Sequence, residues 1–134
     1  MRKVLSLALT AAALMLTGCA SCGNWQRPCI GDRQVVRHVV LFNFKDDVPQ
    51  EKIDEIETAF AALPEKIDVI KGFEWGTDVS VENLAQGFTH CFFITFADEA
   101  GRDEYLPHPA HKEFVALIRP HLEKALVVDY IPGQ

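Results

Sequence analysis

The segment that most constrains the fold is residues 35–45, VVRHVVLFNFK, because both of its alternating sets of side chains are apolar. Val39 and Leu41 belong to one set. The other set consists of Val36, His38, Val40, Phe42 and Phe44. Successive side chains of a strand point to opposite faces of the sheet. The segment therefore predicts a strand that is covered on both sides.

Helix and strand patterns alternate along the rest of the chain. Residues 46–64 carry Pro49 near an acidic first turn, followed by Ile53, Ile56, Phe60 and Leu63 at helical spacing. Strands are predicted in 69–80, 88–97 and 124–132, and helical segments in 99–106, capped by Asp98, and 109–122. The order β, α, β, β, α, α, β predicts an α+β ferredoxin-like fold, a split βαβ plait.

This topology carries expectations about the sheet and its partner. We expect the first and third strands to lie side by side and parallel at the centre of the sheet. Helices can cover only one face, and the other face is also apolar, so a second copy is the simplest cover. The sequence therefore predicts a homodimer in which two sheets close into a dimeric α/β barrel.

The first eighteen residues have the pattern of a secretory signal peptide. Arg2 and Lys3 precede an uncharged apolar run to about Leu16, which is too short to span a bilayer comfortably. Residues 16–19, LTGC, resemble a bacterial lipoprotein box, so we expect lipidation at Cys19. An ordinary signal peptide that is cleaved nearby is the alternative.

The expected organisation is a signal peptide at 1–18, a tether at 19–34 and a folded domain at 35–134. Ala20 follows the lipidated cysteine, which predicts anchoring in the cell envelope, at the periplasmic face of the outer membrane in a Gram-negative cell. The membrane would then be contacted through the N-terminal lipid alone.

The chain has three further cysteines, and the envelope location predicted for it is oxidising. Cys22 and Cys29 lie in the tether, where a small disulfide loop and two free thiols both remain open. Cys91, inside an apolar strand, is predicted to be a buried free thiol.

After removal of residues 1–18 the chain has eleven basic and nineteen acidic residues, a net charge of about −8. Nucleic acid binding is therefore disfavoured, because it needs a positive face.

The candidate reaction centre is the segment YLPHPAHKEF, residues 105–114. Pro109 suits a first helical position, which puts His111 in the first turn, where the helix dipole lowers the pKa of an imidazole. His111 precedes Phe114 by three residues, so we expect it to point inward as a general base. Tyr105 would offer a phenol to the same cavity. His108 is predicted to be a solvent-facing cap.

Two strand histidines extend this candidate site. His38 and His90 are each the third residue of their segments, VRH and FTH, and parallel strands would bring them together. A metal held by these two histidines and His111 is an open alternative, although no Asp or Glu is clearly placed to orient them. Asp129 lies on an apolar strand, and alternation does not reveal whether it faces the cavity.

Five segments together resemble the stress-responsive A/B barrel domain (Dabb) family: RHVVLFNFK, WGTDVS, GFTHCFFITF, YLPHPAH and VVDYIP, between residues 36 and 132. The resemblance implies a dimeric α+β barrel. Most bacterial members have no assigned activity, and some plant members are associated with stress responses. One plant branch includes polyketide cyclases that need no cofactor and use the tyrosine and final histidine of a Y-x-x-HPAH motif. Those positions are Tyr105 and His111, and the strand histidines of the family match His38 and His90.

Four functions remain as hypotheses. The first is a cofactor-free enzyme in which His111 removes a proton from a small apolar carbonyl compound while Tyr105 stabilises the oxyanion. The second is a module that binds an apolar molecule, the third is haem chemistry, and the fourth is a non-catalytic stress-related protein of the envelope.

Overall fold

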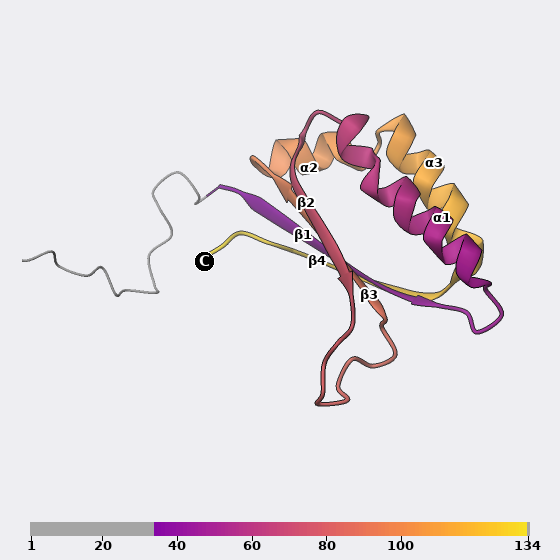
Figure 1. Ribbon diagram of the computed structural model, residues 1–134. Helices are drawn as coiled ribbons and strands as arrows, with labels where there is room; N and C mark the ends of the chain where they lie inside the picture. The colour runs from indigo at the N-terminus through magenta and orange to yellow at the C-terminus, as the bar shows by residue number, and fades with distance from the viewer. Residues whose placement is uncertain (1–33, 134) are drawn as a thin grey trace, which may run out of the picture.

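The computed structural model describes residues 34–133 as one layer of helices on one layer of sheet (Figure 1). The strands are β1 (Val36–Phe44), β2 (Ile70–Thr77), β3 (His90–Phe96) and β4 (Leu122–Tyr130). The helices are α1 (Gln50–Ala61), α2 (Glu99–Tyr105) and α3 (Pro109–Ile118), with short 3₁₀ turns at Leu63–Glu65 and Arg119–His121. This order confirms the predicted ferredoxin-like α+β fold. The predicted signal peptide at 1–18, the predicted tether, Cys19, Cys22 and Cys29 lie outside the described residues.

The sheet order is β2-β3-β1-β4, and all three neighbouring pairs are antiparallel. The predicted adjacency of the first and third strands is correct, but their predicted parallel direction is wrong. The physical reason is the connection between them. The crossover through α1 makes β2 run in the same direction as β1, and the short return from β2 then makes β3 run opposite to both.

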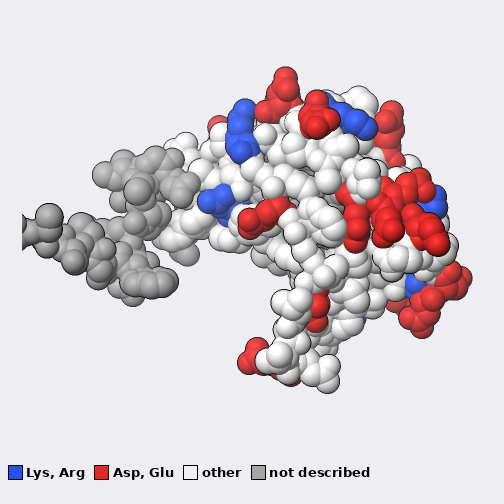
Figure 2. Space-filling model, viewed as in Figure 1, with Lys and Arg blue, Asp and Glu red and all other residues white. Residues whose placement is uncertain are grey.

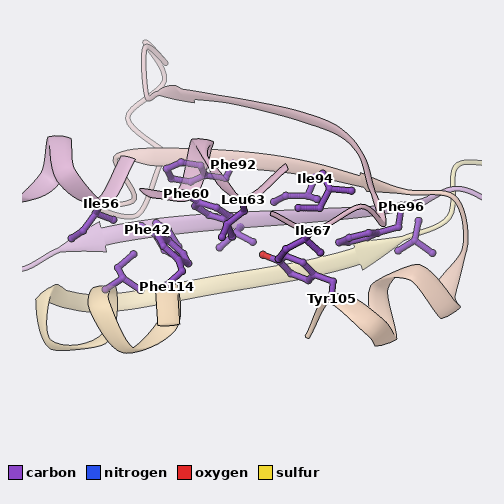
Figure 3. Close-up of a cluster of buried hydrophobic side chains, with 14 of the residues drawn as sticks. Phe42, Ile56, Phe60, Leu63, Ile67, Phe92, Ile94, Phe96, Tyr105 and Phe114 are labelled. Atoms are coloured by element: carbon purple, nitrogen blue, oxygen red, sulfur yellow. The ribbon is translucent and has the colours of Figure 1, made fainter. Parts of the chain in front are cut away.

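The helices cover one side of the sheet, which we call the inner face. It carries a continuous apolar core in which aromatic rings from the sheet and the helices interlock, as Phe60 of α1 does when it stacks on Phe92 at 4.4 Å (Figure 3). Asp98 caps α2 by accepting from the backbone N–H of Gly101 at 2.9 Å, as predicted. The cap fixes the start of the helix that delivers Tyr105 to the core.

The opposite side, the open face, has no covering element among residues 34–133. Its centre is apolar and half-buried to exposed, with Val39 and Leu41 of β1 beside Leu126 and Val128 of β4. Cys91 lies on this face, so the prediction that it is buried is wrong: it is a free, exposed thiol. Strand alternation turns it away from the inner face, where both of its neighbours in β3 are buried.

Charge is unevenly distributed over the helical layer. Acidic side chains gather over α1 in Figure 2, where Glu51, Asp54 and Glu55 are exposed. No helix within residues 34–133 has the length and apolar character needed to cross a bilayer.

Candidate active site

Tyr105 is the last residue of α2 and is completely buried in the core. Its hydroxyl oxygen is directed toward the middle of the apolar cluster (Figure 3) and has no hydrogen-bond partner among residues 34–133. Burial raises the pKa of this hydroxyl well above its usual value. The phenol is therefore a protonated hydrogen-bond donor at neutral pH, and no residue in the described part of the chain accepts from it. An unsatisfied buried polar group of this kind costs about 1–3 kcal/mol.

His111, in the first turn of α3, packs its ring against the ring of Tyr105 with centroids 4.2 Å apart. Its Nδ1 lies 3.0 Å from the backbone carbonyl oxygen of Leu106. A carbonyl can only accept, so Nδ1 carries the proton and Nε2 holds the lone pair of the neutral ring. Burial lowers the pKa of His111 below 6.5, whereas the bond to the Leu106 carbonyl acts in the opposite direction. The neighbouring His38 and His108 add smaller effects that also lower the pKa. The cause of the low pKa is thus mainly desolvation, whereas the sequence suggested the helix dipole.

The ring of His38 also packs against the ring of Tyr105, with ring centroids 5.8 Å apart. Its Nδ1 donates to Oδ1 of Asp129 at 2.6 Å, across the β1–β4 pair. The second oxygen of Asp129 accepts from Arg102 of α2 at 3.2 Å. A cation, a carboxylate and an imidazole therefore form one connected group, which fixes the orientation of His38 beside Tyr105.

His90 is not part of this cluster, so the prediction that the two strand histidines lie together is wrong. In the antiparallel register Phe42 is opposite His90, whereas His38 is opposite Ile94. Four residues of strand separate the two histidines, roughly 13 Å. His90 instead donates from Nε2 to Glu57 of α1 at 2.9 Å.

This separation also removes the geometry of the three-histidine metal alternative. Within the described chain, no three His, Cys, Asp or Glu side chains are grouped so that they could hold a metal ion. Each strand histidine does have an acidic partner, contrary to the expectation from sequence. Those partners come from segments far away in the chain.

The other two sequence candidates are placed as follows. His108 is the N-cap of α3, where its Nδ1 accepts from the backbone N–H of Ala110 at 3.2 Å, in agreement with its predicted capping role. Asp129 faces the inner side of the sheet, which alternation alone left open.

Sequence reasoning missed Glu57 and Arg102. Glu57 was hidden among the acidic residues of an amphipathic helix, and Arg102 sits in a short helix rich in charge. Inspection of the helix faces would have found that Arg102 and Tyr105, three positions apart, lie on one side of α2. No local signal connects Glu57 to His90, 33 positions away.

The arrangement can perform acid–base chemistry on a carbonyl compound. His111 presents a neutral imidazole with Nε2 as the basic nitrogen, and Tyr105 presents a donor suited to a developing oxyanion. His38, which is held by the carboxylate of Asp129, packs against the same phenol ring.

Comparison with known proteins identifies the family to which this fold belongs. The model of the stress responsive A/B barrel domain family matches residues 36–132. The stress-response A/B barrel domain-containing protein HS1 of Arabidopsis thaliana is 48% identical over 97 residues, which cover 72% of this chain and 89% of that protein. Olivetolic acid cyclase of Cannabis sativa is 33% identical over 97 residues, which cover 72% of this chain and 96% of the cyclase.

Solved structures show the same fold. Hydroxynitrile lyase from Passiflora edulis aligns with a TM-score of 0.71 at 34% identity, covering 74% of this chain and 94% of the lyase. A dimeric ferredoxin-like protein of unknown function from Thermobifida fusca aligns with a TM-score of 0.64 at 26% identity, covering 73% and 91%. The family match, residues 36–132, includes every strand and helix described above. The chain belongs to the stress-responsive A/B barrel domain family, Dabb.

Proposed function

We propose that this protein binds a small, mainly apolar carbonyl compound and catalyses a cofactor-free acid–base step on it. The observation that carries the proposal is the buried hydroxyl of Tyr105, which has no hydrogen-bond partner within the described residues. It lies next to His111, whose tautomer leaves Nε2 basic. A ligand carbonyl would satisfy the hydroxyl and compensate the cost of burying it. Relatives named as a cyclase and a lyase support a small-molecule role.

In the proposed step, Nε2 of His111 removes a proton from the carbon next to the carbonyl group. The C–H electron pair moves into the carbonyl system, and the resulting enolate oxygen accepts a hydrogen bond from Tyr105. The imidazolium of His111 then returns its proton to the product. Burial favours the neutral form of His111 that this step requires. Through Asp129, Arg102 keeps His38 oriented beside the phenol.

Hydrogen–deuterium exchange tests this step directly. The protein would be incubated in D₂O with 2-decanone, and loss of the α-proton signal would be followed by NMR. We expect His111→Asn to slow the catalysed exchange on the order of 10²-fold or more, the usual size of a lost general base. His121→Asn is the matched control, because His121 lies in the 3₁₀ turn beyond α3. Equal rates for the wild type and His111→Asn would rule out the proposed base.

We also propose a homodimer that closes over the open face. Its support is the exposed apolar centre of that face and the dimeric state of the aligned Thermobifida fusca protein. The site around Tyr105 lies on the inner face, so the dimer would leave it on the outer side of the barrel.

We propose, finally, that the chain is anchored to the envelope by a lipid on Cys19. The support is the sequence LTGC after a short apolar run. Metabolic labelling with a palmitate analogue in bacterial cells tests it: the wild type should incorporate label and Cys19→Ala should not. Label in the Cys19→Ala variant would contradict lipidation at this residue.

A further inference from the structure

A groove of about 500 Å³ runs along the outer side of α3, and His111 lines it. Val115 and Ala116 lie one helical turn further along the same face and form an apolar floor. Because its ring also contacts Tyr105, His111 connects this groove to the site on the inner face. The groove lies on the helical layer, so a partner that covered the open face would leave it accessible.

Two basic side chains, Lys112 and Arg119, line the same groove, and no acidic side chain does. Neither forms a hydrogen bond or ion pair through its side chain with any residue in the described part of the chain. A single exposed lysine is normally a solvated surface charge. Lys112 and Arg119 differ from such a lysine because both flank one apolar groove next to the candidate base. The protein as a whole has a net charge of −6.

The spacing along α3 sets the shape of a ligand that would use all of these groups. His111 and Arg119 are eight residues apart, roughly 12 Å along the helix axis. Lys112 is adjacent to His111, and the apolar floor lies between the two ends. An elongated molecule with an apolar chain would contact the floor, and a negative group on it would be attracted by the two cations.

We propose that the substrate is an anionic amphiphile: a carbonyl compound with an apolar chain and a carboxylate, held in the α3 groove by Lys112 and Arg119. This inference rests on the proposed function, because it places the reacting end of the molecule at His111. The charge complementarity favours an acid over a neutral ketone or alcohol of equal length.

Binding of decanoate and decan-1-ol, followed by NMR shifts of the Val115 and Ala116 amides, tests the inference. We expect the wild type to bind decanoate roughly five- to tenfold more tightly than decan-1-ol, as one exposed charge contact and the longer-range attraction of the second cation allow. Lys112→Gln combined with Arg119→Gln should abolish this preference without weakening binding of the alcohol. Added salt should weaken decanoate binding alone.

The matched control combines Lys66→Gln with Lys71→Gln, which removes the same number of charges at exposed positions away from the groove. It should keep the preference, and Arg119→Lys should keep most of it. The inference is overturned if the wild type does not prefer decanoate, if the groove variant retains the preference, or if the control loses it equally. Absence of exchange that depends on His111, with the preference intact, would instead overturn the proposed function and leave the anion-binding groove.

Discussion

Tyr105 combines a structural cost with the proposed function. Its hydroxyl is buried and has no partner in the part of the chain that the structure describes, so Tyr105→Phe removes an unsatisfied group while keeping the ring in the core. We expect this variant to be more stable than the wild type by about 1 kcal/mol in urea unfolding, and to lose the catalysed exchange. Tyr105→Leu serves as the control, because it also removes the ring and should destabilise. A Tyr105→Phe variant less stable than the wild type would show that the hydroxyl has a partner in the folded protein.

The histidine next to it gives a pH prediction. Burial lowers the folded-state pKa of His111 below the ordinary 6.5, so the unfolded chain binds this proton more readily than the folded protein does. The contribution of His111 to the free energy of unfolding is therefore fully present above pH 6.5 and is lost as the pH falls through the lower folded-state pKa. His111→Asn should lose less stability than the wild type when urea unfolding is compared above and below pH 6.5. An equal loss in both proteins would assign the acid sensitivity to other groups.

The same shift predicts the pH dependence of the exchange reaction. A general base acts in its neutral form, so the rate should remain high below the ordinary histidine pKa and fall only where His111 becomes protonated. The midpoint of the acid limb should therefore lie below 6.5. A midpoint above 6.5 would indicate that a group other than His111 is the base.

At the scale of elements, the pair Glu57–His90 connects α1 to β3. Both side chains are largely buried, and Nε2 of His90 donates to the carboxylate at 2.9 Å. Glu57→Ala leaves that buried donor unsatisfied, so we expect it to lower the free energy of unfolding by about 1–3 kcal/mol. His90→Phe combined with Glu57→Ala should cost less than the sum of the two single substitutions. Strict additivity in urea unfolding would show that the pair is not coupled.

Most helices, strands and helix caps of this protein could be predicted from the sequence. The helices and strands follow from apolar periodicity, and the caps Asp98 and His108 bond to backbone N–H groups two or three residues away. Each of these signals is local, because the residues that form it lie within one short segment of the chain. The positions of Tyr105 and His111 on neighbouring helices were predictable for the same reason.

At the scale of the whole molecule, the open face gives the prediction about assembly. Leu126 lies on this face at 40% exposure, whereas its neighbour Val127 points to the other side of β4. Leu126→Lys would bury a charge in the proposed interface, so sedimentation velocity should show a monomer. Val127→Lys is the matched control and should remain dimeric. A wild type that sediments as a monomer would overturn the homodimer.

The sequence alone determined which segments are helices and strands, which side chains share a face, and which segment carries Tyr105 and His111, because these properties depend on neighbours within a few residues. Only the tertiary structure decided the separation of His38 from His90 and the exposure of Cys91. It also decided the bond between His38 and Asp129, which are 91 positions apart. These features depend on how strands are ordered and which face the helices cover. That arrangement is set by packing of the entire chain, and no local pattern encodes it.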